Sequence, residues 1–508
     1  MIPLPCIFCK AVISLSAQRD HFNTSAQRDN SGQRAIARTI QENRWYDFVH
    51  HQPRASQLSS ILSHLKGVVT GSPSAPTVRD WPAGTTPTPE YEKAIDFLRE
   101  GAGHLFVTGR AGTGKSTLLR AMRDMITDDV AVVAPTGLAA VNVGGQTIHS
   151  FFGLPPRTIR PDDIKRSRNG GVMRKLKLLV IDEVSMVRSD MMWAIDQSLR
   201  INRGKSREPF GGLRLVMFGD LHQLPPVVQE GEAAEYLDST FGGPFFFSVG
   251  ALQDGVGTHR LELTEVFRQS DEELISVLNE VRDGEPSQAA LAVLNRQVNP
   301  LRTLGQGDPY VILTPTNAVA QRINAAYLEA LPATPFAYQA GVTGEFSASA
   351  HPTDQTLVLK LGAKVIMLRN DADRRWVNGT IARISKLDEK RVWIDIDGKE
   401  YEIEPVAWES RRYGYDQEAQ KVVETVAGTF KQFPIRLAWA LTIHKAQGLT
   451  LDKVYISLGR GTFAHGQAYV ALSRCRSLEG LALDRPLRSS DIIFDPAALR
   501  YRDVFPRI

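Results

Sequence analysis

Short, largely apolar runs of residues recur along the chain from about residue 90 onward. Four of them lie at 105–107, 130–134, 177–181 and 213–218, and small or acidic residues follow each one. Continuous apolar runs of this length are typical of strands buried on both faces of a parallel sheet. In open α/β sheets, ligands bind at the carboxyl ends of the strands. The pattern therefore predicts an α/β domain with a ligand site at that edge.

The pattern returns later in the chain and predicts a second parallel sheet. Its strands are expected at 310–313, 435–441 and 454–458. An amphipathic helix is expected before them, from about 271 to 282, because Asp283-Gly284 is a helix stop signal.

A different pattern interrupts the second sheet between about 332 and 434. Stretches of strand length that alternate or run apolar occur at 365–368, 380–384, 391–396 and 401–403. Asp397-Gly398 is a hairpin-turn dipeptide, and the 3.6-residue period of a helix is absent. We therefore expect a small antiparallel β-barrel inserted into the second sheet.

These patterns divide the chain into several parts. Its 508 residues are too many for one core, so roughly two to four domains are expected. We expect a flexible arm and linker at 1–89, a first domain at 90–230 with a small wedge insertion at about 150–175, the first part of a second domain at 231–331, the barrel at 332–434, and the completion of the second domain at 435–508.

A glycine-rich loop follows the first predicted strand and leads into a helix-forming run. The segment GRAGTGKS fits the pattern GxxxxGK[ST] in strand–loop–helix order. Its glycines allow backbone N–H groups to point inward, and the positive end of the helix faces the same spot. We expect Lys115 to reach the β- and γ-phosphates of a nucleotide and Ser116 to bind Mg²⁺. The alternative is a glycine-rich turn that matches the pattern by chance. Such a turn would not need a strand before it and a helix after it, and both are predicted here.

The residues expected to hold the nucleotide phosphates are Gly109, Arg110, Ala111, Gly112, Thr113, Gly114, Lys115, Ser116 and Thr117.

Acidic and polar residues follow two other strands of the first sheet. Asp182 is expected to anchor Mg²⁺, and Glu183 to act as the general base or to orient the attacking water. The alternative is that both cap the end of a strand. Gln223 is expected to sense the γ-phosphate. Because the second sheet has no phosphate loop of its own, we expect it to close over the nucleotide bound by the first.

The segment QTIHSFFGLPP lies between the strands of the first domain and contains two adjacent aromatic residues. Phe151 and Phe152 have two interpretations, base stacking on a nucleic acid or packing in the core. The basic stretch at 165–177 is most simply a solvated face.

Composition indicates the cellular compartment of the protein and limits how it could bind a nucleic acid. The 60 Lys and Arg residues nearly balance the 56 Asp and Glu residues, so any groove that binds nucleic acid must be local. Three cysteines in a chain of this length indicate a reducing compartment. No apolar run approaches the length of a membrane span. We expect a cytoplasmic protein associated with the nucleoid, or a nuclear or mitochondrial one in a eukaryote.

The first 89 residues differ from the rest. They contain a repeated SAQRD, one possible helix at 56–65 and a segment at 71–89 rich in Pro, Gly, Ser and Thr. Cys6 and Cys9 form a single CxxC pair without the second pair of a zinc site. A flexible arm is the default interpretation.

Eight motifs together resemble the PIF-type (petite integration frequency) DNA helicases, which are relatives of the RecD-like enzymes of helicase superfamily one. They are GRAGTGKS, APTGLAA, QTIHSFFGL, VIDEVSM, FGDLHQLPPV, LTEVFRQ, ALTIHKAQGLTLD and YVALSRCRSLEGL, in the family's order over residues 90–508. The resemblance implies two RecA-like P-loop domains, the barrel insertion, Mg²⁺ and ATP as cofactors, and 5′-to-3′ movement on single-stranded DNA by a monomeric motor that also engages forked DNA.

Roles carry over where residues match. Lys115, Glu183 and Gln223 would serve catalysis, and Arg268 and Arg474 would be arginine fingers supplied by the second domain, a role worth roughly 10³–10⁵ in rate. The residues that the resemblance places along the DNA are Thr136, His149, Phe151, Asn317, Thr442, His444 and Lys445.

Tyr91 marks a departure from the family, whose members often have an adenine-reading Gln at this place. It would either stack on the base or belong to the core. Two other functions are compatible with the motifs: a RecD-like motor subunit of a nuclease complex, and a nucleotide-dependent DNA-binding switch that does not translocate.

Overall fold

The computed structural model describes residues 77–508 except 83–84, 101–102, 127–128, 229, 254–256, 270, 300–307, 460 and 463. The paired SAQRD segments, Cys6, Cys9 and the helix expected at 56–65 lie outside the described residues.

The end of the predicted linker packs against the first domain. Val78 forms a β-bridge with Ile126, and the Arg79 backbone N–H donates to the carbonyl of Met125 (2.8 Å). The Trp81 ring stacks on Tyr91, with 6.2 Å between centroids. The prediction of a flexible linker as far as residue 89 is therefore wrong for this part. The reason is that its few apolar residues, Val78 and Trp81, pack against the first core.

The first core is built on a six-stranded parallel sheet in the order β3-β2-β4-β5-β1-β6. Its strands are β1 (His104–Gly109), β2 (Val130–Ala134), β3 (Gln146–Thr147), β4 (Leu178–Ile181), β5 (Arg214–Phe218) and β6 (Thr258–Leu263). Side chains of β1 alternate between two clusters: Leu105 and Val107 pack on one face and Phe106 on the other. Both faces are covered, as the apolar runs predict.

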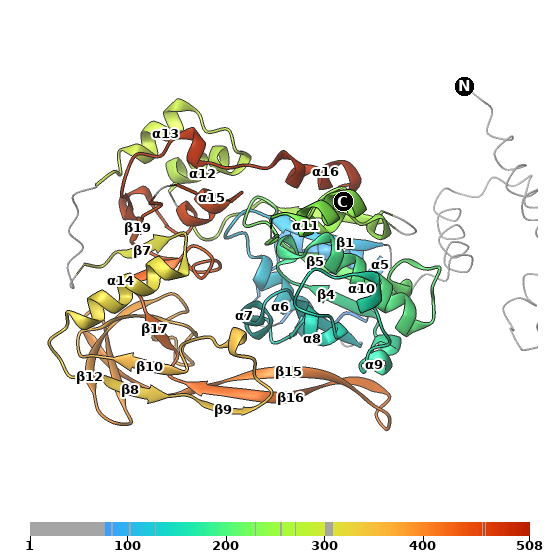
Figure 1. Ribbon diagram of the computed structural model, residues 1–508, viewed down its shortest axis with the longest axis horizontal. Helices are drawn as coiled ribbons and strands as arrows, with labels where there is room; N and C mark the ends of the chain where they lie inside the picture. The colour runs from blue at the N-terminus through green and yellow to red at the C-terminus, as the bar shows by residue number, and fades with distance from the viewer. Residues whose placement is uncertain are drawn as a thin grey trace, which may run out of the picture. The chain divides into compact units, whose positions relative to one another are not determined.

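Helices cover the two faces of this sheet (Figure 1). They are α5 (Pro89–Glu100), α6 (Lys115–Met125), α7 (Gly137–Asn142), α8 (Ile148–Phe152), α9 (Gly170–Lys175), α10 (Ser189–Arg203) and α11 (Glu232–Phe241).

Two segments assigned to the second domain belong to the first core. Strand β6 pairs in parallel with β1 at the edge of the first sheet. The C-terminal helix α16 (Tyr501–Val504) also belongs here, because Tyr501 is buried in the first core with its ring edge-on to Phe106 of β1. The Arg260 N–H donates to the carbonyl of Pro506 (2.8 Å). The boundaries expected at 230 and 435 are therefore wrong, because the partner of a strand in a sheet is not encoded in its own apolar pattern.

The second core contains a four-stranded parallel sheet in the order β18-β7-β19-β20. Its strands are β7 (Val311–Thr314), β18 (Ala440–Thr442), β19 (Val454–Ile456) and β20 (Leu481–Leu483), and its helices are α12 (Glu272–Asp283), α13 (Gln288–Asn295), α14 (Asn317–Glu329) and α15 (Gln467–Leu472). The predicted helix is confirmed as α12. The Asp271 side chain caps it by accepting from the Leu274 N–H, and Gly284 ends it with φ 83°.

The insertion consists of antiparallel sheets, as expected. The largest has five strands in the order β14-β13-β12-β11-β17, and β10-β8 and β15-β16-β9 form two others. The bounds are β8 (Phe336–Gln339), β9 (Gly341–Gly344), β10 (Thr356–Leu359), β11 (Lys364–Met367), β12 (Ile381–Leu387), β13 (Val392–Ile396), β14 (Lys399–Ile403), β15 (Val406–Asp416), β16 (Lys421–Gln432) and β17 (Ile435–Leu437). Asp397 and Gly398 join β13 to β14 with φ 53° and 80°, which is the backbone of a tight hairpin turn.

The strand expected at 435–441 is in fact two strands in different sheets. Strand β17 pairs antiparallel with β11 of the insertion, whereas β18 pairs in parallel with β7 of the second core. One apolar run thus passes from one sheet to the next.

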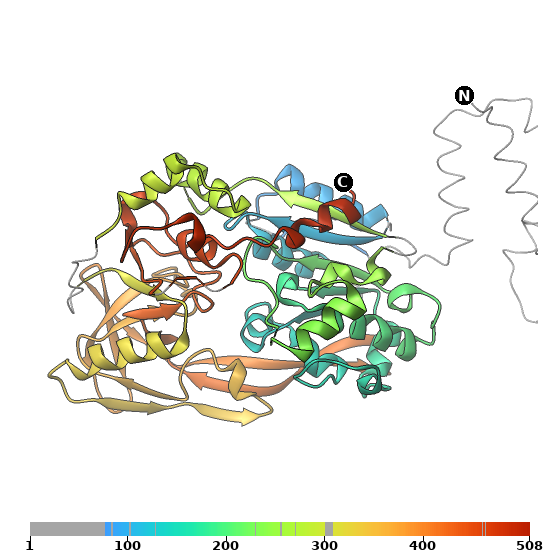
Figure 2. The ribbon, with the colours of Figure 1, turned by 45° about the horizontal axis from the view of Figure 1, so that its top comes forward.

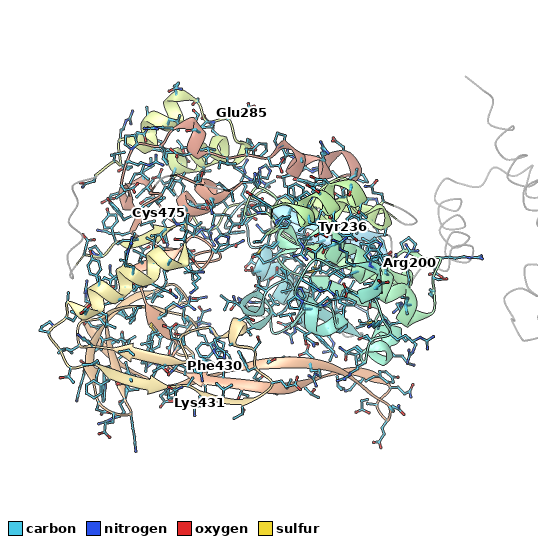
Figure 3. The ribbon with its side chains drawn as sticks, in the orientation of Figure 1. Arg200, Tyr236, Glu285, Phe430, Lys431 and Cys475 are labelled. Carbon is cyan, nitrogen blue, oxygen red and sulfur yellow. The ribbon has the colours of Figure 1, made fainter. Side chains whose placement is uncertain are left out.

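A long hairpin of β15 and β16 extends from the insertion to the first core (Figures 1 and 2). Its Tyr413 is buried in the first core, and the hydroxyl accepts a hydrogen bond from the Val132 N–H (2.9 Å). Arg123 of α6 pairs with Glu424 of β16 (2.7 Å). Neighbouring residues of β16 alternate in burial, with Phe430 buried and Lys431 exposed (Figure 3).

In the described part of the chain, no helix combines the length and the apolar character that a membrane span requires.

Candidate nucleotide site and nucleic-acid track

The phosphate loop lies between β1 and α6, as predicted. Gly112 and Gly114 have φ of 85° and 82°, which side chains rarely adopt, and α6 begins directly after them at Lys115. The Lys115 ammonium donates to the carbonyls of Gly109 (2.7 Å) and Arg110 (3.0 Å). Burial lowers the pKa of Lys115, while the nearby carboxylates oppose that shift. The loop therefore has the curled backbone and the cation that a phosphate requires.

A cavity of ≈ 690 Å³ opens beside this loop and is lined by both cores. Its volume is in the range of nucleotide-sized ligands. Lining residues that the sequence had pointed to are Tyr91, Ala111, Gly112, Thr113, Gly114, Lys115, Ser116, Thr117, Asp182, Glu183, Gln223, Arg268, Lys445 and Arg474. The sequence-based catalytic set thus comes together at one place.

Two neighbouring carboxyl groups end strand β4 in this cavity. Burial raises the pKa of Asp182 to about 6. Burial and the adjacent Asp182 charge raise the pKa of Glu183 to about 7. The Glu183 backbone has φ 48°, an uncommon conformation for a residue with a side chain. A carboxylate that titrates near neutral pH is suited to act as a general base.

Asp220 follows β5, and its pKa is shifted in the opposite direction to those of Asp182 and Glu183. Burial alone would raise its pKa, but Arg282 and Lys115 outweigh this effect and lower the pKa to about 2. Asp220 accepts a hydrogen bond from Gln223 Nε2 (3.0 Å) and forms an ion pair with Arg282 (3.5 Å). It therefore remains charged and holds Gln223 at the cavity.

Gln447 was missed as a site residue by sequence reasoning. Its Nε2 atom approaches Gln223 Oε1 (3.2 Å) and Glu183 Oε2 (3.4 Å). It belongs to the ALTIHKAQGLTLD motif, of which Thr442, His444 and Lys445 were assigned to DNA. The signal was present in the motif, but only the fold shows that one side chain turns toward the nucleotide cavity.

The two candidate arginine fingers reach the cavity from different elements. Arg474 follows α15 in the second core, where burial lowers its pKa to about 9. Arg268 lies in the connection that leaves β6, and its Cβ is packed directly on Gly112 of the phosphate loop. The expectation that the second domain supplies Arg268 is therefore wrong, since this segment is anchored to the first core.

Tyr91 is a buried support of the phosphate loop. It is 3% exposed, and its hydroxyl donates to the carbonyl of Gly114 (2.9 Å). The base-stacking interpretation is therefore wrong for this residue. Phe267, which the sequence did not single out, is instead 58% exposed at the mouth of the same cavity.

Phe151 is the clearest correction among the residues expected to contact DNA. It is fully buried and packs edge-on against Phe152 (4.9 Å between centroids) and against Tyr413 of the hairpin (5.7 Å). Core packing is thus the correct interpretation of both phenylalanines. Ile148, Phe151 and Phe152 follow the i, i+3, i+4 spacing of a helix on the short α8, and all three are buried in the first core.

The other residues of the expected track lie near the ends of parallel strands. Thr136 and His149 are half-buried on the first core, and the Thr136 hydroxyl caps α7 by accepting from the Ala139 N–H (3.2 Å). Asn317, His444 and Lys445 are exposed on the second core. These five side chains remain available to a nucleic acid.

Thr442 is buried, with 2% of its surface exposed, and its hydroxyl accepts from the Lys445 N–H (3.2 Å). The Thr442 side chain therefore stabilises a turn from its buried side. The expectation that it contacts DNA directly is wrong. The insertion also meets the track, because the Ala350 methyl group lies against Gly137, where a Cβ would come within 2.5 Å.

The donor set for a divalent cation is small. Among the described residues, no group of three or more His, Cys, Asp or Glu side chains is placed to bind a metal ion. The Ser116 hydroxyl and the Asp182 carboxylate line the same cavity. They suit Mg²⁺, which keeps several water ligands and shares the phosphates of a nucleotide.

Comparison with known proteins agrees with this geometry. The PIF1-like helicase family matches residues 90–290. The ATP-dependent DNA helicase Pif1 of Bdellovibrio bacteriovorus is 33% identical over 430 residues, which cover 82% of this chain and 92% of that protein. The human ATP-dependent DNA helicase PIF1 is also 33% identical, but only 59% of its length is covered.

Solved structures of Pif1 from Bacteroides resemble this fold to different degrees. Unliganded Pif1 and its complex with ADP-AlF4 both have a TM-score of 0.76, with 36% identity and coverage of 82% of this chain and 97% of theirs. Pif1 bound to single-stranded DNA has the same identity and coverage but a TM-score of 0.59. These relatives and the family match show that the chain belongs to the PIF1-like helicases.

Proposed function

We propose that this chain is an ATP-dependent DNA helicase that moves 5′ to 3′ on single-stranded DNA and unwinds duplex or structured DNA. The observation that carries the proposal is the single cavity that joins the phosphate loop of the first core to Arg474 of the second. The relatives named above are DNA helicases, and another solved Pif1 structure, with 36% identity to this chain, is described as DNA unwinding at forked duplex DNA by two coordinating Pif1 helicases. Replication, repair, recombination and genome maintenance are the settings for such a motor, in the cytoplasm with the nucleoid or in a nucleus or mitochondrion.

Hydrolysis of ATP would use groups from both cores. Lys115 and the loop amides bind the phosphates, and Glu183 accepts the proton of the attacking water. Gln223 and Arg268 face the γ-phosphate, and Arg474 neutralises charge that develops there, an effect worth roughly 10³–10⁵ in rate. Ser116 and Asp182 would hold Mg²⁺, which neutralises phosphate charge when it is bound.

Movement along DNA follows if the two cores hold the strand differently in different nucleotide states. Thr136 and His149 would contact it on the first core, and Asn317, His444 and Lys445 on the second. Closure around ATP brings the two sets together, and hydrolysis separates them again. Each base-pair step that is opened costs roughly 1.4 kcal/mol of stacking.

Two places are candidates for splitting the duplex. Leu154 is buried, so in the 154–156 loop the half-buried Pro155 and the exposed Pro156 are the residues able to meet a base pair. The antiparallel sheets of the insertion are the other candidate. We propose a monomeric motor, because every predicted catalytic group comes from a single chain.

A strand-displacement assay tests this function. Duplexes with a 5′ or a 3′ single-stranded tail are mixed with ATP, Mg²⁺ and the protein, and release of the labelled strand is followed. We expect release from the 5′-tailed duplex only. Lys115→Ala should abolish it, whereas Lys93→Ala, at an exposed position on α5, should not. Release without ATP, or equal release by Lys115→Ala, would exclude an ATP-driven helicase.

A further inference from the structure

The last residue of β18 and the seven residues that follow it form a compact turn, 442–449, which we name the coupling turn. Within it the Ala446 N–H donates to the carbonyl of Thr442 (2.9 Å), and the Leu449 N–H donates to that of Ala446 (3.0 Å). The Gln447 N–H donates to the carbonyl of His444 (3.2 Å). These bonds tie the residues of the turn to one another, so a displacement of one part moves the rest.

One side of the coupling turn faces outward. His444 and Lys445 are exposed at the carboxyl end of a parallel strand, and Lys445 also lines the nucleotide cavity. A cation and an imidazole beside each other suit the phosphates of a nucleic acid strand. These two side chains are the turn's contribution to the proposed DNA track.

The other side of the turn contacts the hydrolytic groups of the first core. The Gln447 amide lies between Glu183 Oε2 (3.4 Å) and Gln223 Oε1 (3.2 Å), and it donates to both. Glu183 is the candidate base and Gln223 the candidate γ-phosphate sensor. A single side chain of the second core thus engages both of them.

The backbone of the same turn contacts both candidate arginine fingers, and Arg474 also donates to the Val470 carbonyl (2.8 Å) and the Ser473 hydroxyl (2.7 Å) of its own segment. Arg268 Nη2 donates to the carbonyl of Gly448 (3.2 Å), and Arg474 Nη1 donates to that of Leu449 (3.4 Å). Arg268 Nη1 is buried without a hydrogen-bond partner among the described residues. A guanidinium that is bound to carbonyls and only partly satisfied is ready to exchange them for a phosphate.

We propose that the coupling turn restrains ATP hydrolysis until a DNA strand binds to His444 and Lys445, and that Gln447 is the positioning residue through which this restraint acts. Gln447 occupies one oxygen of the Glu183 carboxylate, where the attacking water must be bound. The carbonyls of Gly448 and Leu449 occupy guanidinium groups that the γ-phosphate needs. A strand that shifts the turn frees these groups together. The inference rests on the proposed function, since it concerns how DNA controls that reaction.

The test compares ATP hydrolysis with and without a labelled oligodeoxythymidylate strand for the wild-type chain and for Gln447→Met. Methionine keeps the length of the side chain but cannot donate a hydrogen bond. We expect the rate without DNA to rise roughly two- to tenfold, the range set by one or two lost hydrogen bonds. The rate with DNA should stay near that of the wild type, so that the stimulation ratio falls. Affinity for the strand, measured by fluorescence anisotropy, should be unchanged.

Gln447→Ala serves as a second variant, and Gln197→Met on α10 is the matched control, since that half-buried glutamine lies in the first core away from the cavity lining. The proposal is overturned if both rates of Gln447→Met fall in parallel, which would make Gln447 part of the chemistry. It is equally overturned if the stimulation ratio matches that of the wild type. Failure of the proposed function looks different, because the wild-type chain itself would then show no stimulation by DNA.

Discussion

The two cores share an architecture but not an inventory of functional groups. Both contain a parallel sheet with polar residues at the carboxyl ends of its strands. The first core carries the phosphate loop, the Asp182-Glu183 pair and Gln223, whereas the second contributes Arg474 and the coupling turn. The difference teaches that neither core holds a complete hydrolytic set. With the proposed function, turnover of ATP would depend on how closely the two cores approach, as a motor driven by nucleotide state requires.

Removing Arg474 would break this division of labour most severely. Arg474→Ala should lower ATP turnover by roughly 10³–10⁵, because the developing charge on the γ-phosphate loses its cation from the second core. Binding of a fluorescent ATP analogue should persist, since the phosphate loop is intact. Arg476→Ala is the control: this neighbour is exposed and pairs with Asp452. Unchanged turnover in Arg474→Ala would remove that residue from its role.

Removing the base tests the first core alone. Glu183→Gln should reduce turnover by roughly 10²–10⁴ and retain both ATP and DNA binding, because the amide fills the same space but accepts no proton. Glu285→Gln, at an exposed position labelled in Figure 3, is the matched control. Full activity of Glu183→Gln would mean that another group activates the water.

The pH dependence sharpens the same assignment. The pKa of Glu183 is raised to about 7 from an ordinary value near 4.5, and the base must be deprotonated to work. The value of kcat/KM for ATP should therefore rise with pH through about 7 and level off above it, falling up to tenfold per unit on the acidic side. A rise centred near 4.5 would contradict a raised pKa at Glu183, and an unchanged profile in Glu183→Gln would show that another group titrates.

The smallest effect concerns the support of the phosphate loop by Tyr91. Tyr91→Phe removes the hydrogen bond to the Gly114 carbonyl and should raise KM for ATP roughly two- to tenfold with little change in kcat. Tyr236→Phe should leave KM unchanged, because Tyr236, labelled in Figure 3, lies with its ring under Arg160 and does not line the cavity. If Tyr91 instead stacked on the base, loss of its hydroxyl would leave KM unaltered.

Local patterns predicted much of this molecule. The strands of the first sheet, the phosphate loop, the capped helix α12 and the Asp397-Gly398 turn each depend on residues close together in the chain. Their geometry follows from short-range sterics and from burial on both faces of a sheet. The apolar patterns also predicted two parallel-sheet cores and an antiparallel insertion, and the resemblance added roles for individual residues such as Arg268 and Arg474.

What the sequence did not predict depends on contacts between distant residues. Nothing in the apolar run at β6 tells which sheet it joins, and the burial of Phe151 requires the hairpin that brings Tyr413 to it. The same holds for Gln447, whose role appears only when the second core is placed against Glu183. In each of these cases, the contact that decides the role of the residue or strand comes from a distant part of the chain.

One measurement tests the central claim most directly: ATP hydrolysis by the wild-type chain with and without single-stranded DNA, at two salt concentrations because phosphate contacts are salt-dependent. If DNA brings together groups that are divided between two cores, hydrolysis should be strongly stimulated by the strand, less so at high salt, and stimulation should be lost in Arg474→Ala. Hydrolysis that proceeds at the same rate with and without DNA would contradict the claim that a strand controls the approach of the two cores.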